Sequence, residues 1–134
     1  MSESTQKKPN IIIVDDDSIS RGILASFVST LGYAAQENAT GSSMYKYISH
    51  HQPVAVLLDI NLPHQCGMQL LSQIRQKFSP EQLPVIIVSV EGSSKMIKQA
   101  LADGANDYLV KPIKIEKLEK MLNQHIDRDL AFAD

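Results

Sequence analysis

Four short, unbroken runs of apolar residues constrain the fold of this 134-residue chain most strongly. The runs are rich in β-branched residues and occupy positions 11–14, 54–58, 85–88 and 108–110. Because they are continuous rather than alternating, they are typical of strands in a parallel sheet that is covered on both faces. A weaker strand is expected at 33–37, just after Gly32, and its polar content suits the edge of the sheet.

Between these runs, apolar residues recur at helical spacing. One stripe of residues four positions apart predicts a helix through Ile19, Ile23, Phe27 and Leu31. Shorter stripes predict four further helices, around positions 44–48, 70–78, 97–101 and 115–122. The expected N-caps are Ser18, Thr40 and Ser93 or Ser94, and Gly104 follows the fourth helix at the place of a C-cap.

The expected strands begin about 20 to 30 residues apart, which is the length that a right-handed βαβ crossover needs. Five such units are too few to close an eight-stranded barrel. The prediction is therefore an α/β fold, a flavodoxin-like (βα)5 three-layer sandwich whose five-stranded parallel sheet has the order 2-1-3-4-5. Residues 1–9 are expected to form a flexible lead-in, 10–126 the domain, and 127–134 a tail or the start of a linker.

Composition excludes several classes of function. The formal net charge is −2, so nothing electrostatic favours nucleic acid or an anionic membrane as a partner. The longest apolar runs are far shorter than the roughly 20 residues of a membrane helix, and the polar N-terminus is no secretory signal. A single cysteine, Cys66, cannot form an internal disulfide. We therefore expect a cytoplasmic domain with no membrane contact and no direct nucleic acid binding.

Reactive side chains follow four of the five expected strands. Ligands of open α/β sheets bind outside the carboxyl ends of the strands, so these side chains are expected to converge. They are Asp15, Asp16 and Asp17 after the first strand, Asp59 and Asn61 after the third, Ser89 and Glu91 after the fourth, and Lys111 after the fifth. Asp17 is assigned to the favourable position of an acid at a helix N-terminus.

Charge compensation predicts a metal at this edge. Asp15, Asp16 and Asp59 carry three negative charges against the one positive charge of Lys111, and a divalent cation neutralises the difference. Oxygen ligands favour a hard ion, which indicates Mg²⁺, with Mn²⁺ as a substitute. A carboxylate beside such an ion, a lysine and a hydroxyl is suited to attack a phosphoryl group.

Four segments, at 12–18, 57–63, 86–89 and 108–112, together resemble the receiver domain of two-component response regulators over about residues 9–126. The resemblance implies that Asp59 is the phosphoacceptor and that Asp16 and Asp59 bind Mg²⁺ directly. It implies that Asp15 binds the ion through water and that Asn61 offers its backbone carbonyl oxygen. It also implies that Lys111 pairs with the phosphoryl group, and that the bond from Lys111 to Pro112 is cis.

The same resemblance implies a switch and its partners. Ser89 is similar to the hydroxyl that binds a phosphoryl oxygen, and Tyr108 to the aromatic residue that rotates. The donor would be a sensor histidine kinase or a histidine phosphotransfer protein. The output would be a downstream effector protein, or a fused domain outside this chain, bound at the face of the fourth helix, fifth strand and fifth helix. The domain would be a monomer or weak dimer, and would catalyse only its own phosphorylation and dephosphorylation.

The sequence departs from the family pattern at several positions. Val90 stands where alanine or glycine is common, and its bulk is expected to narrow access to the phosphoryl site. The loop at 64–67 lacks the aspartate that often precedes the glycine, and the fifth helix lacks the arginine pattern of regulators that dimerise on DNA. Asn61, Val90 and Glu91 are expected to tune dephosphorylation. The two polar residues would orient water and give the short-lived signal of chemotaxis-type regulators.

Three other functions fit less well. A dehalogenase-like phosphatase needs a second carboxylate two residues after the nucleophile, where this chain has Asn61. A flavodoxin-like electron carrier needs a phosphate-binding loop after the first strand, where Asp15, Asp16 and Asp17 would repel the phosphate. A pseudo-receiver that is never phosphorylated would not need the complete set of site residues.

Overall fold

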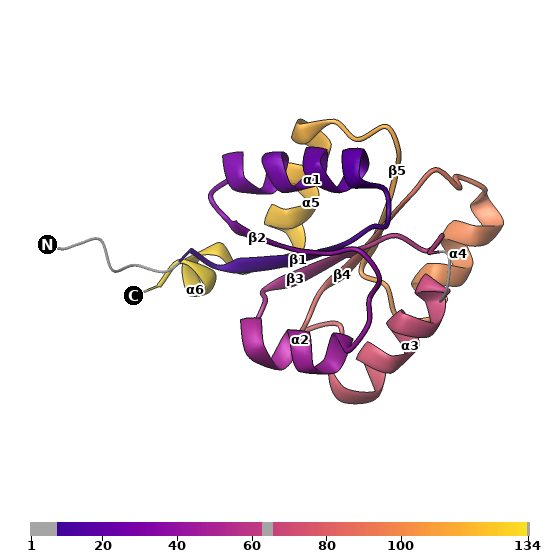
Figure 1. The fold of residues 1–134 in the computed structure, drawn as a ribbon, viewed down its shortest axis with the longest axis horizontal. Coiled ribbons are helices and arrows are strands. Elements are labelled where there is room, and N and C mark those ends of the chain that lie inside the picture. Colours follow the sequence, from indigo (N-terminus) through magenta and orange to yellow (C-terminus); the bar gives the residue numbers. More distant parts are fainter. Residues whose placement is uncertain (1–7, 63–65, 134) are drawn as a thin grey trace, which may run out of the picture.

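A computed structural model describes residues 8–62 and 66–133, and its centre is a parallel sheet between two layers of helices (Figure 1). The sheet has five strands in the order β2-β1-β3-β4-β5, which confirms the predicted topology. The weak second strand lies at the edge, as its polar composition indicated. The strands are β1 (Asn10–Val14), β2 (Ala34–Asn38), β3 (Ala55–Leu58), β4 (Val85–Ser89) and β5 (Asp107–Val110).

The helices divide between the two faces of the sheet. On one face lie α1 (Ser18–Thr30) and α5 (Ile115–His125), and on the other lie α2 (Met44–His51), α3 (Gly67–Lys77) and α4 (Ser94–Ala102) (Figure 1). Ile11 and Ile13 of β1 pack into the cluster under α1 and α5, while Ile12 and Val14 pack into the cluster on the opposite face. Burial on both faces is the reason that the strands read as continuous apolar runs.

Two of the predicted helix starts are wrong. The N-cap of α1 is Asp17 rather than Ser18, because the Asp17 carboxylate accepts the backbone N–H of Ser20 at 3.3 Å. Ser43 rather than Thr40 precedes α2, in the left-handed conformation and without a side-chain cap. Ser93 is confirmed as the cap of α4, where its hydroxyl accepts the backbone N–H of Met96 at 3.2 Å.

Arg75 of α3 ties together three segments at the amino-terminal end of the sheet. Its guanidinium donates to the carbonyl oxygens of Gly104 at 2.7 Å, Leu83 at 3.0 Å and Phe78 at 3.2 Å, and to the amide oxygen of Asn106 at 2.8 Å. Gly104 has φ +111°, and a Cβ there would lie 2.9 Å from the Arg75 side chain. Both the turn after α4 and the approach of Arg75 therefore require glycine.

Within the segment expected to be a tail or linker, a short helix, α6 (Arg128–Ala131), packs back onto the domain. The ring centroids of Phe132 and buried Tyr33 are 5.2 Å apart. The Arg128 guanidinium lies 4.5 Å from the Phe132 ring and donates to the Tyr33 hydroxyl at 3.1 Å. In the described residues, no helix has the length and apolar character required to span a membrane.

Candidate functional site

The loops at the carboxyl ends of β1, β3, β4 and β5 carry the candidate site. Asp15 and Asp16 follow β1, Asp59 follows β3, Ser89 ends β4 and Lys111 follows β5. Because β1, β3, β4 and β5 are consecutive neighbours in the sheet, these residues come from adjacent strand ends. The structure thus brings together side chains that lie up to about a hundred positions apart in the chain.

Three carboxylates form the acidic part of the site. Asp15, Asp16 and Asp59 each offer an oxygen atom, and these three atoms all lie within 4.8 Å of one another. Asp15 and Asp59 are buried, whereas Asp16 is exposed, so the cluster is open to solvent on one side. A set of converging carboxylate oxygens with one open side suits a hard divalent cation that keeps some of its water.

Lys111 bridges two of these carboxylates. Its Nζ lies 2.8 Å from Oδ2 of Asp15 and 3.1 Å from Oδ2 of Asp59. Burial works to lower the pKa of Lys111, but hydrogen bonds and charge attraction from the two carboxylates outweigh it and raise that pKa above its usual value. The ammonium group therefore stays protonated at neutral pH. The bond between Lys111 and Pro112 is cis, as the resemblance implied.

The surroundings of Asp59 oppose the ionisation of its carboxyl group. Burial raises its pKa above the usual value, and the backbone N–H of Asn61 and the Lys111 ammonium oppose that rise only in part. The Asn61 N–H lies 2.9 Å from Oδ1 of Asp59. A further cation at the cluster would therefore favour the ionised carboxylate, which is the form that can act as a nucleophile.

Gly67 lies directly against the backbone of Asp59 and Ile60. It is the first residue of α3, and its amide donates to the carbonyl oxygen of Ile60 at 3.0 Å. A Cβ at this position would lie 2.5 Å from the carbonyl oxygen of Asp59. The close approach of α3 to the site therefore depends on glycine. Most of the preceding loop segment, residues 63–65, lies outside the described residues.

Hydrogen bonds link Ser89 to the turn that follows it. The Ser89 hydroxyl accepts the Asn61 side-chain amide at 3.3 Å and the Glu91 backbone N–H at 3.1 Å. The hydroxyl of Tyr108, whose ring is buried, donates to the carbonyl oxygen of Glu91. The Glu91 side chain is exposed and Val90 is 70% exposed, so Val90 directs most of its side chain to solvent.

Two residues of α1 contact Asp15 and were not among the predicted site residues. The Ser20 hydroxyl donates to Oδ2 of Asp15 at 2.8 Å. Arg21 donates to the backbone carbonyl oxygen of Asp15 at 2.7 Å and to the Glu37 carboxylate at 3.3 Å. The only signal in the sequence was a hydroxyl and a guanidinium on the first turns of the helix after the acidic run.

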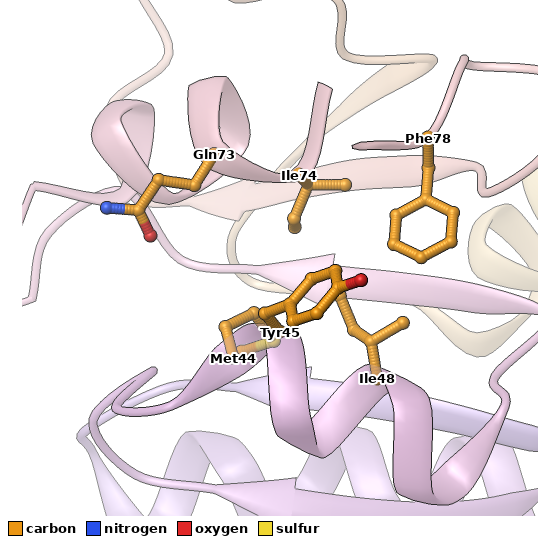
Figure 2. Close-up of a pocket in the computed structure, with 6 residues that line it drawn as sticks. All are labelled: Met44, Tyr45, Ile48, Gln73, Ile74 and Phe78. Atoms are coloured by element: carbon orange, nitrogen blue, oxygen red, sulfur yellow. The ribbon is translucent and has the colours of Figure 1, made fainter. Parts of the chain in front are cut away.

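A pocket between α2 and α3 is lined by none of the residues of the acidic cluster. Figure 2 shows its lining side chains. Apolar side chains line it together with the amide of Gln73 and the phenol of Tyr45. No acid, histidine or cysteine is among the lining residues, so they offer no carboxylate, imidazole or thiolate to a metal. The lining residues are Met44, Tyr45, Ile48, Gln73, Ile74 and Phe78.

Comparison with known proteins agrees with this arrangement. The sequence profile of the response regulator receiver domain matches residues 11–123. A chemotaxis protein CheY homolog of Campylobacter jejuni is 32% identical over 118 residues, which cover 84% of this chain and 91% of that protein. The transcriptional regulatory protein KdpE of Staphylococcus aureus is 31% identical over 132 residues, which cover 92% of this chain and 55% of that protein.

The chain thus spans little more than half the length of the KdpE relative. Among solved structures, the BeF3-activated N-terminal receiver domain of Klebsiella pneumoniae RstA superposes with a TM-score of 0.81 at 25% identity. That match covers 88% of this chain and 98% of the RstA domain. The profile, the relatives and the strand order agree, and the chain belongs to the family of response regulator receiver domains of two-component systems.

Proposed function

We propose that residues 10–126 form a phosphoacceptor switch in the cytoplasm, with Asp59 as the residue that is phosphorylated. The observation that carries this proposal is the Asp59 carboxylate itself. It lies at the open end of the sheet, next to two further carboxylates and in contact with the Lys111 ammonium at 3.1 Å. The donor would be a sensor histidine kinase or a histidine phosphotransfer protein, the class of partner that serves receiver domains.

Mg²⁺, or Mn²⁺ in its place, is the cofactor that fits the acidic cluster. Asp16 and Asp59 would bind it directly, the Asn61 carbonyl oxygen would complete the protein ligands, and Asp15 would bind it through water. The ion would supply positive charge to the phosphoryl oxygens. The donor set supports this assignment, because it consists of oxygen atoms from three carboxylates within 4.8 Å of one another.

The transfer follows from the chemistry of the side chains. A carboxylate oxygen of Asp59 forms a bond to phosphorus while the bond from phosphorus to the donor's imidazole nitrogen breaks, so the phosphoryl group moves without net oxidation. The Lys111 ammonium neutralises one phosphoryl oxygen, and the Ser89 hydroxyl donates a hydrogen bond to another. The domain then removes the group by hydrolysis, so its only catalysis acts on itself.

The signal would pass from Ser89 to the surface through Glu91 and Tyr108. Ser89 accepts the Glu91 backbone N–H, and Tyr108 donates to the Glu91 carbonyl oxygen, so a movement of Ser89 reaches β5 directly. Beside that path, Leu101 of α4 and Val110 of β5 expose 45% and 37% of their surface. We place the effector contact on this α4–β5–α5 face.

The partner on that face would be an effector protein or a fused output domain. The matched regulators have different printed roles, chemotaxis for one and transcription for another, so family membership alone does not choose the output. A net charge of −2 favours a protein partner over direct contact with nucleic acid. We expect the domain to be a monomer or weak dimer.

Replacement of the phosphoacceptor tests the proposal. Wild type, Asp59→Asn and the control Asp103→Asn are incubated with acetyl phosphate and Mg²⁺, and intact mass is measured. Asparagine keeps the size of the side chain but is not a nucleophile, so we expect no adduct on Asp59→Asn. Asp103 is exposed at the end of α4, so its variant should react like wild type. An adduct on Asp59→Asn at the wild-type level would contradict the assignment.

A further inference from the structure

Asp15 is the most buried carboxylate of the site, and its two oxygens have three hydrogen-bond donors. Oδ1 accepts the backbone N–H of Asp17 at 3.0 Å. Oδ2 accepts both the Ser20 hydroxyl and the Lys111 ammonium, each at 2.8 Å. Because the Asp15 side chain is 1% exposed, bulk water cannot readily replace a donor that leaves.

Lys111 is the donor that has a second task. It already divides its N–H groups between Asp15 and Asp59. On the function proposed above, on which this inference rests, it must also turn an N–H to the phosphoryl group on Asp59. When Lys111 turns an N–H from Asp15 to the phosphoryl group, the Ser20 hydroxyl is the remaining side-chain donor to Oδ2 of Asp15.

The start of α1 holds Ser20 in place for this contact. Its backbone N–H is bonded to the capping carboxylate of Asp17 at 3.3 Å, while its hydroxyl reaches Asp15. The nearby guanidinium of Arg21 contacts the backbone oxygen of Asp15 and the Glu37 carboxylate instead. Among the described residues, the hydroxyl of Ser20 is thus the neutral side-chain donor to the Asp15 carboxylate.

We propose that Ser20 is a positioning residue for phosphoryl transfer, which keeps Oδ2 of Asp15 hydrogen-bonded and so lets Lys111 turn to the phosphoryl group. Without this hydroxyl, Lys111 becomes the sole side-chain donor to Oδ2, and the buried carboxylate holds the ammonium more tightly. The loss should therefore appear only when a phosphoryl group, or a mimic of it, competes for Lys111.

The test compares two affinities in the same proteins. The first is for Mg²⁺ alone, and the second is for beryllofluoride, a stable phosphoryl mimic, at saturating Mg²⁺. Both are measured by calorimetry for wild type, Ser20→Ala, Ser20→Thr and Ser18→Ala. Threonine keeps the hydroxyl, and Ser18 is an exposed serine on the same helical turn, which makes it a matched control. Thermal denaturation without Mg²⁺ confirms that each variant is folded.

We expect Ser20→Ala to bind beryllofluoride about tenfold more weakly, the scale of one hydrogen bond to a charged group, with Mg²⁺ affinity unchanged. Ser20→Thr should recover most of the loss, and Ser18→Ala should match wild type. Equal losses for both ligands would show a merely structural role and overturn the proposal. So would wild-type beryllofluoride binding by Ser20→Ala, or a Ser20→Thr variant as weak as Ser20→Ala.

The outcomes also separate this inference from the proposed function. A wild-type protein that binds no beryllofluoride and takes no phosphoryl group from acetyl phosphate would overturn both. A wild type that binds the mimic, together with a Ser20→Ala variant of equal affinity, would overturn the role of Ser20 and leave the function of Asp59 intact.

Discussion

Two cations, each mostly withdrawn from solvent, lie at opposite ends of β5 and behave differently. Lys111 follows the carboxyl end of the strand, and its partners are the carboxylates of Asp15 and Asp59. Arg75 lies beside the amino-terminal end, and its partners are backbone carbonyl oxygens and the amide oxygen of Asn106. The carboxylates that contact Lys111 can also bind a metal ion, and the Lys111 ammonium can also bind a phosphoryl group. Arg75 donates to neutral acceptors, one of which, the Asn106 amide oxygen, also accepts the backbone N–H of Val85 at 2.9 Å.

The pKa values of the two cations follow this difference. Burial lowers the pKa of Arg75, and the charge of Glu81 offsets only part of that change. Burial acts on Lys111 in the same direction, but its two carboxylates outweigh it and raise the pKa. A planar guanidinium with several fixed donors suits a permanent structural contact, whereas a compact ammonium can redirect its hydrogen bonds. The contacts of Arg75 at the amino-terminal end of the sheet are therefore permanent. Lys111 at the carboxyl end can change its hydrogen-bond partners.

Removal of the Arg75 guanidinium should have the largest effect on the free energy of unfolding. We expect Arg75→Ala to lower the free energy of unfolding by about 3 kcal/mol, because several partly buried acceptors lose their donor at once. The loss should be the same with and without Mg²⁺, since the contacts lie at the end of the sheet remote from Asp59. Guanidinium chloride denaturation measures both values.

Arg75→Lys provides the control for charge. One ammonium group cannot reach acceptors on three segments, so this variant should recover less than half of the stability that Arg75→Ala loses. A variant as stable as wild type would show that the guanidinium geometry is unimportant. A loss in Arg75→Ala that Mg²⁺ restores would remove the contrast with the site.

Removal of the Lys111 ammonium should lower the free energy of unfolding by less. The size of this loss should depend on Mg²⁺. We expect Lys111→Met to lower the free energy of unfolding by about 2 kcal/mol in a chelator, because two buried carboxylates lose their compensating charge. Mg²⁺ supplies charge at the same cluster, so saturating Mg²⁺ should reduce the loss. Denaturation curves at several Mg²⁺ concentrations give the measurement, and equal losses with and without Mg²⁺ would argue against an exchangeable site.

The fold was largely predictable because it depends on local patterns. A strand buried on both faces needs an unbroken apolar run, and 11–14, 54–58 and 85–88 show it. The end of the chain was less predictable. The helix α6 has four residues, too few for an apolar period, and it is fixed by contacts of Arg128 and Phe132 with Tyr33, about a hundred positions away.

The same distinction applies to individual residues. The acidic cluster could be predicted because strand ends converge in any sheet of this order. Arg75 could not, because its acceptors are mostly backbone carbonyl oxygens, which leave no mark in the sequence. Ser20 was missed for a related reason, since only the fold of the chain brings its hydroxyl to Asp15. The cap at Asp17 was misplaced by one residue, where two neighbouring side chains were both chemically suitable.

The smallest expected effect concerns the lifetime of the phosphoryl group on Asp59. The backbone of Glu91 is held by Ser89 and Tyr108, but its carboxylate is exposed and free to orient a water molecule for attack on phosphorus. Leucine at position 91 removes the carboxylate and leaves both backbone contacts in place. We therefore expect Glu91→Leu to slow the decay of phosphorylated Asp59 about threefold.

Substitution of Val90 tests the opposing effect, in which side-chain bulk limits the access of water to the phosphoryl group. Its side chain is 70% exposed, so it obstructs the site little, and Val90→Ala should speed the decay less than twofold, well below the typical contribution of a positioned base. Decay is followed by intact mass after removal of acetyl phosphate, with Mg²⁺ held constant. Faster decay in Glu91→Leu would rule out orientation of water by this carboxylate. A Val90→Ala effect larger than that of Glu91→Leu would show that steric access, rather than polar orientation, sets the lifetime.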